Sequence, residues 1–438
     1  MSYSYFGKKI LILGMGLTGI SCINFFLKKG IKVKIIDESK NSIHFVKLPK
    51  NIEYYLGSLE HKWILESDLI IISPGISSFK PILIKARSLG IEIISDIELF
   101  SREANAPIIS ITGTNGKSTV ATMVKKIAQN AGYKVCLGGN IGFPALQMLD
   151  KKANLYIIEL SSFQLENIFN LKSKIAVVLN IKEDHMDRYI NGYEQYKKIK
   201  LSIYDQADIC IINSKENINH LIKNKNKISF GMKNSDYYTD HKKEYSILYC
   251  KQKKILNSQQ ILLYGNHNYD NALVSLAISD AMLFPRKETL DTIKNFLTLP
   301  HRFQVIKNSR GINWINDSKS TNVYSTKTAL DSLNIKGTIR LLLGGDSKSA
   351  NFDILRVYFK KLKIKIYCFG KDRDKLFQIC KKKSICVQNL KQAMKLISKQ
   401  VESGDVVLLS PGCSSLDQFS NFEERGNLFI KLTKELTS

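Results

Sequence analysis

The chain has 438 residues, which is long for one hydrophobic core and favours about three domains. Its net charge is +26, but the basic residues are 55 Lys and only 10 Arg, spread along the whole chain. There is no Arg-rich stripe and no basic patch interleaved with aromatic residues, so the composition argues against nucleic-acid binding. A solvated, Lys-rich surface that favours anionic substrates is the better interpretation.

The cysteines and the apolar residues indicate the cellular compartment. The 8 Cys form no C-x-x-C pair and no metal-type cluster, which argues against a zinc site and fits reduced thiols. No apolar run reaches the roughly 18 residues of a membrane-spanning helix. We therefore expect a cytoplasmic protein that does not insert into membranes.

The segment from Lys8 to about Leu99 alternates short apolar stretches with amphipathic ones. Buried strands are predicted at Ile10–Leu13, Val33–Ile36, Leu69–Ile72 and Ile91–Ile94. Such alternation is typical of a parallel sheet covered by helices. Ligands of open parallel sheets bind at the carboxyl ends of the strands, so motifs at those ends carry the most information.

A glycine motif follows the first of these strands. Gly14-Met15-Gly16-Leu17-Thr18-Gly19 opens a helix predicted over Ile20–Lys29, and Asp37 ends the next strand. Helix amides can bind a diphosphate and a strand-end carboxylate can bind a ribose hydroxyl, so the motif suits a nicotinamide dinucleotide or a UDP-sugar. The turn Ser73-Pro74-Gly75-Ile76 ends a later strand, where an ordinary strand-to-loop turn is the alternative.

The most informative segment follows a polar linker expected at Ser101–Pro107. It is Ser110-Ile111-Thr112-Gly113-Thr114-Asn115-Gly116-Lys117-Ser118-Thr119, between an apolar strand and a helix predicted over Val120–Gln129. Backbone amides of such a loop can surround phosphate oxygens, Lys117 can contact the β- and γ-phosphates, and the hydroxyl of Ser118 or Thr119 can bind Mg²⁺. ATP or GTP chemistry is the leading interpretation, and a merely structural turn is the alternative. Ile111 stands where the general phosphate-loop pattern has a glycine.

The second α/β block extends to about Pro300, with strands predicted at Tyr156–Ile158 and Ala176–Leu179. Glu159 ends the first of these strands and could bind a Mg²⁺ held by Ser118, or cap a helix instead. Residues 213–260 are rich in Lys, Asn and Ser and show little periodicity.

Two more polar motifs belong to this block. The loop Glu183–Arg188 places His185 among three carboxylates, which suits a second metal ion, whereas an isolated histidine is more often structural. A helix predicted from Gly265 to Ser279 opens with Asn268 and Asp270, which could face a base or ribose or act as caps.

The third block has strands predicted at Leu341–Leu343, Ile366–Phe369 and Val406–Leu409. Polar motifs lie at strand ends or sharp turns, at His301-Arg302, Asn316–Asn322, Gly344–Lys348 and Ser410–Phe419. Each lysine alone is expected to be solvated, but together these motifs offer cations and hydroxyls for carboxylates and phosphates on one anion-binding face.

A set of polar motifs extends, in order, over nearly the whole chain. The motifs are T-G-T-N-G-K-S-T, E-L-S-S-F-Q-L-E, E-D-H-M-D-R-Y, G-N-H-N-Y-D-N, H-R-F, N-D-S-K-S-T-N, G-G-D-S-K-S and S-P-G-C-S-S-L-D-Q-F. This set resembles the Mur ligase family. The two serines and Phe-Gln after Glu159, and L-D-Q-F near the C-terminus, look most like the members that add D-glutamate. The D-N-P-R type of loop found in ligases that add a diamino acid does not occur in the sequence. Alanine-adding ligases and folylpolyglutamate synthases share the phosphate loop but not the N-terminal G-x-G-L-T-G match.

The resemblance implies an α/β fold of three domains. These are an N-terminal Rossmann-like parallel sheet that binds a UDP-sugar (1–97), a central P-loop ATPase domain (98–300) and a C-terminal Rossmann-like domain that binds an amino acid (301–438).

The resemblance also implies an ATP-dependent amide ligation in peptidoglycan precursor synthesis. ATP would phosphorylate the alanyl carboxylate of UDP-N-acetylmuramoyl-L-alanine, and the amine of D-glutamate would displace phosphate from the acyl phosphate. Two Mg²⁺ sites, a monomeric state and no nucleic-acid partner are expected. After Asp37 the chain has Glu38-Ser39 where relatives often have Thr-Arg, so the uracil-side contacts there are not carried over.

Residue roles implied by the resemblance fall into groups. The catalytic residues would be Lys117, His185, Lys200, Lys319 and Lys348. ATP would be bound by Gly113, Thr114, Asn115, Gly116, Lys117, Ser118, Thr119, Asn271, Arg302 and Asp317. The UDP-sugar would be bound by Leu17, Thr18, Asp37, Gly75 and Asn140. D-glutamate would be bound by Lys319, Thr321, Lys348, Ser415, Leu416 and Phe422. The metal ligands would be Ser118, Glu159, His185 and Lys200, the last as a carbamate.

Two other classes stay open on the sequence alone. A nicotinamide-dependent dehydrogenase would use the glycine motif but leaves Lys117 and Glu159 without a role. A nucleic-acid-binding ATPase would use the phosphate loop and the basic surface, and its binding would weaken steeply with salt.

Overall fold

The computed structural model describes residues 3–40, 46, 48–150, 152–242, 245–263, 265–333, 335 and 337–437. The chain forms two compact units. The first unit comprises Met1–Ile181, Glu194–Gln260 and Asp270–Lys294, and the second comprises Lys182–Tyr193, Ile261–Tyr269 and Asn295–Ser438. Within the described part of the chain there are three sheets, two in the first unit and one in the second.

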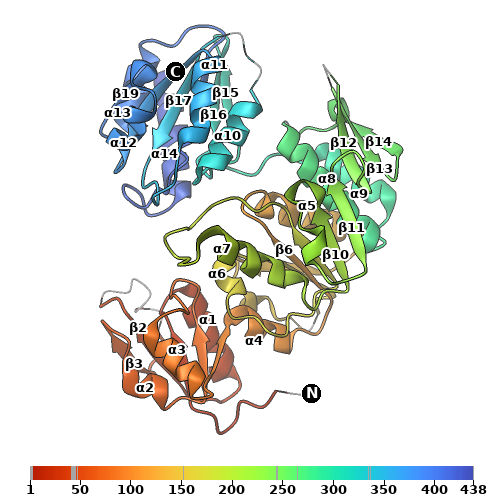
Figure 1. The fold of residues 1–438 in the computed structure, drawn as a ribbon, viewed down its shortest axis with the longest axis vertical. Coiled ribbons are helices and arrows are strands. Elements are labelled where there is room, and N and C mark those ends of the chain that lie inside the picture. The colour runs from red at the N-terminus through yellow and green to blue at the C-terminus, as the bar shows by residue number, and fades with distance from the viewer. Residues whose placement is uncertain are drawn as a thin grey trace. The chain divides into compact units, whose positions relative to one another are not determined.

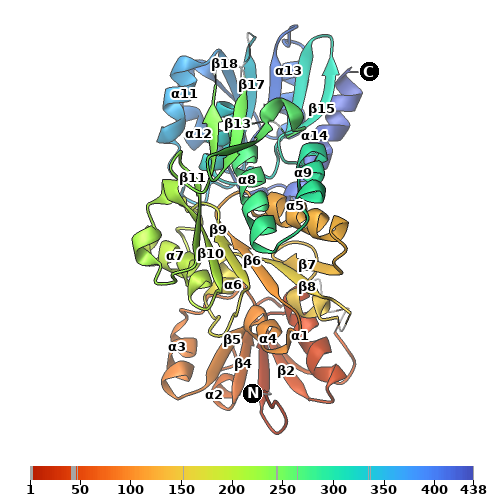
Figure 2. The same cartoon turned by 90° about the vertical axis from the view of Figure 1, so that its right-hand side faces the viewer.

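The N-terminal sheet has five parallel strands in the order β3-β2-β1-β4-β5. The strands are β1 (Ile10–Leu13), β2 (Val33–Asp37), β3 (Glu53–Leu56), β4 (Leu69–Ile72) and β5 (Glu92–Ser95). Helix α1 (Leu17–Lys28) covers one face, and α2 (His61–Leu65) and α3 (Pro81–Ser88) cover the other (Figure 2). The strand order reverses between β1 and β4, which is where doubly wound sheets bind ligands.

The central sheet has nine strands in the order β14-β13-β12-β11-β10-β9-β6-β8-β7. Pairing is parallel from β7 to β12 and antiparallel through β13 and β14. The strands are β6 (Ile108–Thr112), β7 (Val135–Gly139), β8 (Leu155–Glu159), β9 (Ile175–Val178), β10 (Ile209–Asn213), β11 (Lys227–Gly231), β12 (Tyr237–His241), β13 (Ser246–Cys250) and β14 (Lys253–Asn257). The stretch 213–260, which has little periodicity, therefore forms most of an added sheet edge.

The helices around this sheet are α4 (Asp96–Glu103), α5 (Lys117–Asn130), α6 (Ser162–Leu165), α7 (Gly192–Leu201), α8 (Asn266–Ala281) and α9 (Arg286–Asn295). The linker expected at Ser101–Pro107 is only partly correct, because Ser101–Glu103 form the last turn of α4. Helix α4 packs through the buried side chains of Ile97, Leu99 and Phe100.

The C-terminal sheet has six strands in the order β15-β16-β20-β17-β18-β19, parallel except for the β15–β16 pair. The strands are β15 (Gln304–Ser309), β16 (Ile312–Asn316), β17 (Ile339–Gly344), β18 (Ile364–Phe369), β19 (Ser384–Cys386) and β20 (Val406–Leu409). The helices are α10 (Val323–Asp331), α11 (Arg356–Lys361), α12 (Arg373–Ile379), α13 (Leu390–Ser398) and α14 (Phe422–Thr437).

Alternate residues of these strands face two separate cores. Leu341 and Leu343 of β17 lie in the core formed with α10, α11 and α12, while Leu342 lies in the core formed with α13 and α14. Figure 1 shows the helices along this sheet. Because both faces of the sheet are covered, β17, β18 and β20 are continuous apolar runs, which is why the sequence predicts them. The sequence did not predict β15, β16 or β19.

The α/β fold class with a three-sheet arrangement is confirmed. No helix in the described residues is long and apolar enough to cross a membrane.

Candidate active site

The glycine motif of the N-terminal sheet forms a tight turn against Asp37. A Cβ atom at Gly19 would lie 1.9 Å from the carbonyl oxygen of Gly14, so only glycine fits there. The backbone N–H of Met15 donates to Oδ2 of Asp37 at 2.5 Å, and the N–H of Ser39 donates to Oδ1 at 2.7 Å. The Asp37 carboxylate thus ties the glycine turn to the end of β2.

The other expected UDP-side residues lie at loops or helix starts of the first unit. Leu17 begins α1 and is exposed, Thr18 is half-buried beside it, and Gly75 is exposed after β4. Ser73 Oγ donates to the Gly14 carbonyl at 3.3 Å, which joins the turns after β1 and β4 at the reversal point of the sheet.

The phosphate loop runs from β6 into α5. Gly113 has φ +152° and Gly116 has φ +88°, values that L side chains rarely adopt. The ammonium of Lys117 donates to the carbonyls of Gly113 and Thr114, both at 2.9 Å. Ser118 and Thr119 are buried in the first turn of α5, at the positive end of the helix dipole.

Asn180, which follows β9, holds this loop in shape. Its carbonyl accepts from Thr114 N–H at 2.9 Å, its Oδ1 accepts from Asn115 N–H at 2.9 Å, and its Nδ2 donates to the Asn115 carbonyl at 3.0 Å. Sequence reasoning assigned Asn180 no role. The available signal was its place directly after a buried strand next to the loop.

Glu159 ends β8, beside the phosphate-loop strand β6. Its Oε1 accepts from Asn140 Nδ2 at 2.9 Å, while Oε2 is buried and has no hydrogen-bond partner among the described residues. The side chain is only 2% exposed. A buried carboxylate oxygen without a partner is costly, and a bound cation relieves that cost. This observation fits a divalent cation at Glu159.

Lys200 is buried beside the same loop, at 1% exposure. Its Nζ donates to the Gly113 carbonyl at 3.0 Å and to Thr112 Oγ1 at 3.3 Å, and lies 4.8 Å from the ring centre of Tyr196. The Tyr196 hydroxyl is 3.0 Å from Thr114 Oγ1. Sequence pattern alone predicts solvated lysines here; only the resemblance singled out Lys200, and nothing singled out Tyr196.

Asn271 on α8 reaches the loop from another direction. A Cβ at Gly116 would lie 2.7 Å from Asn271 Oδ1, so the α8 side chain packs directly on the loop backbone. The phosphate loop, Asn140, Glu159, Lys200 and Asn271 therefore lie together in the first unit.

The second unit carries the remaining predicted residues. Asp317 accepts from Phe303 N–H at 3.0 Å and from Ser410 Oγ at 2.9 Å, and burial raises the pKa of Asp317 to about 7. Burial and the neighbouring Arg302 cation lower the pKa of His267 to about 4, so its ring is neutral at pH 7.

Lys319 and Lys348 lie on different turns of this unit. Lys319 Nζ is 3.7 Å from the ring centre of Phe422, a cation–π contact. Lys348 Nζ is 3.5 Å from Oδ1 of Asp184, which is also 3.7 Å from His185 Nε2. The loop that carries His185 thus packs with the C-terminal sheet, in the same unit as Lys348.

Three further expected residues flank these lysines. Thr321 is half-buried, Ser415 is buried and Leu416 is 72% exposed. Asn322, next to Thr321, donates from Nδ2 to Asp184 Oδ2 at 3.4 Å.

Sequence reasoning missed Arg425 of α14, which is fully buried. Its guanidinium donates to Oγ and the carbonyl of Ser318 at 3.0 and 2.8 Å, and to the Cys413 carbonyl at 3.1 Å. It therefore holds the turns next to Lys319 and Ser415. No sequence motif marked it, because its partners are over 10 residues away and are mostly backbone atoms.

No group of three or more His, Cys, Asp and Glu able to hold a metal occurs in the described residues. This is compatible with Mg²⁺, which is commonly bound by one or two carboxylates together with substrate phosphates.

Models of three Mur ligase domains match the chain. They are the Mur ligase MurD-like N-terminal domain at residues 8–95, the Mur ligase middle domain at 111–279 and the Mur ligase glutamate ligase domain at 301–413.

Full-length relatives agree with these matches. The UDP-N-acetylmuramoylalanine–D-glutamate ligase of Buchnera aphidicola subsp. Acyrthosiphon pisum (strain Tuc7) is 73% identical over 100% of both chains. The enzyme of that name from Escherichia coli (strain K12) is 47% identical over 99% of both.

Solved structures share the fold at low identity. The UDP-N-acetylmuramate-alanine ligase of Thermotoga maritima has a TM-score of 0.62 and 18% identity, covering 98% of this chain and 99% of its own. MurF ligase from Thermotoga maritima, in complex with ADP, has a TM-score of 0.64 and 17% identity, covering 99% and 98%. By its domain matches and its full-length relatives, the chain belongs to the Mur ligase family.

Proposed function

We propose that this protein joins D-glutamate to UDP-N-acetylmuramoyl-L-alanine in an ATP-dependent, ADP-forming reaction of peptidoglycan precursor synthesis. The observation that carries the proposal is the buried Oε2 of Glu159 beside the phosphate loop, in a chain 73% identical over its whole length to a ligase of that name. The glycine turn at Asp37 then holds a uridine diphosphate sugar rather than a nicotinamide dinucleotide.

The chemistry follows from the poor reactivity of a carboxylate toward amines. Transfer of the γ-phosphoryl group to the alanyl carboxylate gives an acyl phosphate and ADP. The D-glutamate amine then attacks the acyl carbon, and the tetrahedral intermediate collapses with loss of phosphate and a proton. Lys117 and the loop amides stabilise the negative charge on the transferring phosphoryl group.

We propose Ser118 and Glu159 as the ligands of one Mg²⁺, and His185 and a carbamylated Lys200 as ligands for a second. The buried Glu159 oxygen supports the first site. The position of Lys200 supports its role, because its buried Nζ lies against the Gly113 carbonyl and Thr112 Oγ1, next to the loop proposed to hold the phosphates. Bound Mg²⁺ would neutralise phosphate charge and orient the γ-phosphoryl group.

The remaining roles are proposed on the same basis. Asn271, Arg302 and Asp317 would contact the nucleotide, and Leu17, Thr18, Asp37, Gly75 and Asn140 would contact the UDP-sugar. Lys319 and Lys348, with Thr321, Ser415, Leu416 and Phe422, would bind D-glutamate and orient its amine.

We also propose the functional division into domains 1–97, 98–300 and 301–438, with a monomeric enzyme acting in the cytoplasm without nucleic acid. Sedimentation of the purified protein measures the oligomeric state directly.

The test is ADP release with purified protein, ATP and Mg²⁺. Turnover should require both UDP-N-acetylmuramoyl-L-alanine and D-glutamate, and L-glutamate or L-alanine in place of D-glutamate should give little. Lys117→Ala should abolish it. No turnover with the complete set, or equal turnover with L-glutamate, would refute the proposed function.

A further inference from the structure

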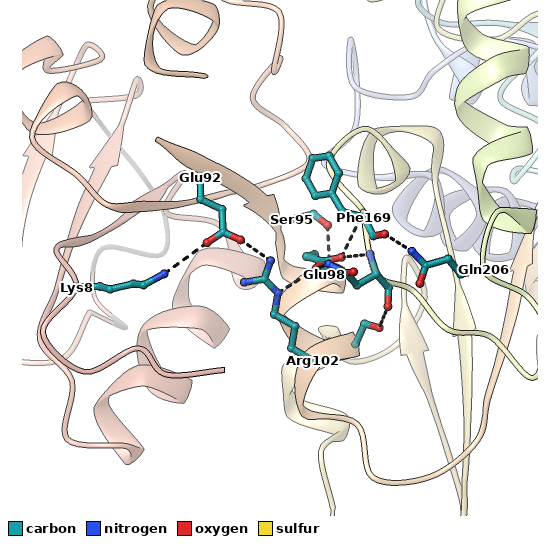
Figure 3. A network of polar contacts seen from close by, with 9 residues as sticks. Lys8, Glu92, Ser95, Glu98, Arg102, Phe169 and Gln206 are labelled. Carbon is teal, nitrogen blue, oxygen red and sulfur yellow. Dashed lines mark hydrogen bonds and ion pairs between the residues drawn. The ribbon is translucent and has the colours of Figure 1, made fainter. Parts of the chain in front are cut away.

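The carboxylate of Glu98 is fully buried at the junction of the N-terminal and central sheets of the first unit. Its Oε2 accepts from the backbone N–H groups of Phe169 and Asn170 at 2.9 and 2.8 Å. Its Oε1 accepts from Asn170 Nδ2 and Arg102 Nε, both at 2.9 Å. Figure 3 shows how Glu98 reaches from α4 to the backbone at Phe169 in the central domain.

The hydrogen bonds keep this carboxylate ionised. Burial alone would raise the pKa of Glu98, but the donors from Asn170, Phe169 and Arg102 outweigh it and hold the pKa below its usual range. An ionised carboxylate with four donors is a strong and directional joint.

Other contacts bind the same short segment, Glu166–Asn170, to the N-terminal domain and to α4. Arg87 on α3 donates to Asn167 Oδ1 at 2.6 Å, and Ser78 Oγ donates to Glu166 Oε2 at 3.0 Å. The N–H of Ser95 donates to the Asn167 carbonyl at 3.0 Å, and Ser101 Oγ donates to the Asn170 carbonyl at 2.9 Å.

The clamped segment is close in sequence to both halves of the proposed site. It follows α6 directly, and α6 begins three residues after Glu159 with a capping box between Ser161 and Gln164. On the N-terminal side, Ser78 follows the turn that contains Gly75. The joint therefore links the strand end proposed to bind Mg²⁺ with a loop proposed to bind the UDP-sugar.

We propose that Glu98 is a positioning residue for the ligation. It clamps Glu166–Asn170 to α4, the helix that directly follows β5 of the N-terminal sheet and pairs with it through Arg102 and Glu92, and so fixes the angle between the two domains. The inference rests on the proposed function, in which the N-terminal domain holds the UDP-sugar and the central domain holds ATP. The alanyl carboxylate must meet the γ-phosphoryl group in line, and a displacement of about 1 Å can cost roughly 100-fold in rate.

This role differs from general structural support. Each domain keeps its own sheet and its own ligand loops when the joint is loosened. Loss of the joint therefore lowers kcat, while the dissociation constants of ATP and of the UDP-sugar measured separately stay unchanged.

The test compares Glu98→Gln with Glu92→Gln by ADP release and calorimetric binding. The first substitution keeps the shape of the side chain but turns an amide donor toward Arg102 or toward the two backbone N–H groups. Glu92 is a matched control because it also pairs with Arg102, through Nη2 at 2.5 Å, but lies on β5 and has Lys8 as its other partner in place of the clamped segment. We expect kcat of Glu98→Gln to fall about 10- to 100-fold with both binary dissociation constants within about twofold of wild type. Glu92→Gln should stay near wild type.

A folded Glu98→Gln with wild-type kcat would overturn the proposal, as would a loss confined to either binding constant. If Glu98→Gln does not fold, as judged by circular dichroism, Asn170→Ala decides instead. It removes the hydrogen bond from Asn170 Nδ2 to Glu98 Oε1 and keeps the carboxylate, and a kcat reduced by less than about twofold would overturn the proposal. If the wild-type protein itself shows no turnover, the proposed function is refuted; the proposal for Glu98 is refuted only by the outcomes above.

Discussion

The amide Nδ2 of Asn140 donates to Oε1 of Glu159 at 2.9 Å, and the N–H of Asn140 donates to the Glu159 carbonyl at 2.8 Å. These two bonds fix the carboxylate at the end of β8 and leave Oε2 buried without a partner in the described residues. Asn140, which we propose contacts the UDP-sugar, thus orients Glu159, which we propose binds Mg²⁺.

Glu159→Gln tests the metal assignment. It removes the negative charge and keeps the size and the bond to Asn140, so the protein should fold while Mg²⁺ binds more weakly. We expect the Mg²⁺ concentration for half-maximal ADP release to rise at least about tenfold. Glu402→Gln, at an exposed position, is the control. An unchanged Mg²⁺ titration in Glu159→Gln would remove Glu159 from the metal site.

Lys200→Ala tests the carbamate. Activity should be lost, bicarbonate should not restore it, and a small carboxylate such as acetate should restore part of it by replacing the carbamate oxygens. Lys198→Ala, on a more exposed side of the same helix, should be near wild type. Labelled bicarbonate gives a readout without turnover, because its carbon should appear at a carbamate in the wild type and not in Lys200→Ala. Wild-type activity in Lys200→Ala would refute the role.

Lys348→Ala tests the amino-acid site. Loss of a charged hydrogen bond to a substrate carboxylate is worth about 1.5–3 kcal/mol, so KM for D-glutamate should rise roughly 10- to 150-fold. The dissociation constant of ATP should not change. Lys371→Ala is a matched control, since Lys371 lies near the same turn, is exposed and pairs with Asp346 at 2.8 Å. Equal effects of the two substitutions would argue against a specific role for Lys348.

Asp96 predicts a pH dependence of stability. It is 1% exposed, its Oδ1 has no hydrogen-bond partner in the described part of the chain, and burial raises its pKa to about 7. The pKa of an aspartate in the unfolded chain is about 3.9, so the folded state binds the proton of Asp96 more tightly. Its contribution to the free energy of unfolding is therefore greatest below about pH 4, falls as pH rises to about 7, and is constant above that.

Asp96→Asn should remove this slope, which amounts to at most about 4 kcal/mol between pH 4 and pH 7. Urea unfolding followed by the fluorescence of Trp63, in a Trp314→Phe background, reports on the N-terminal domain. Asp374→Asn, whose side chain is 81% exposed, should keep the wild-type slope. Identical slopes for Asp96→Asn and its parent would contradict the assignment.

Local pattern predicted the buried parallel strands because strands covered on both faces are continuous apolar runs, as in Leu69–Ile72 and Val406–Leu409. It did not predict β10, β16, the β11–β14 extension or the edge strands β3, β7, β15 and β19. Edge strands carry mixed residues, so no continuous apolar run marks them. It also placed a linker across the end of α4, because Ser101–Glu103 are polar. In the structure the Arg102 side chain is only 4% exposed and pairs with Glu98 and Glu92.

The phosphate loop, the glycine turn at Asp37 and the strand-end position of Glu159 could all be predicted from the sequence. Backbone amides, glycines and strand ends are local features, and spacing along the chain reports them. The folded structure was needed to show that Asn180 braces the phosphate loop, that Arg425 holds the turns beside Lys319, and that Glu98 clamps Glu166–Asn170. Those side chains act largely on backbone atoms far away in the sequence, and no local pattern records which distant carbonyl or N–H the folded chain brings within hydrogen-bond distance.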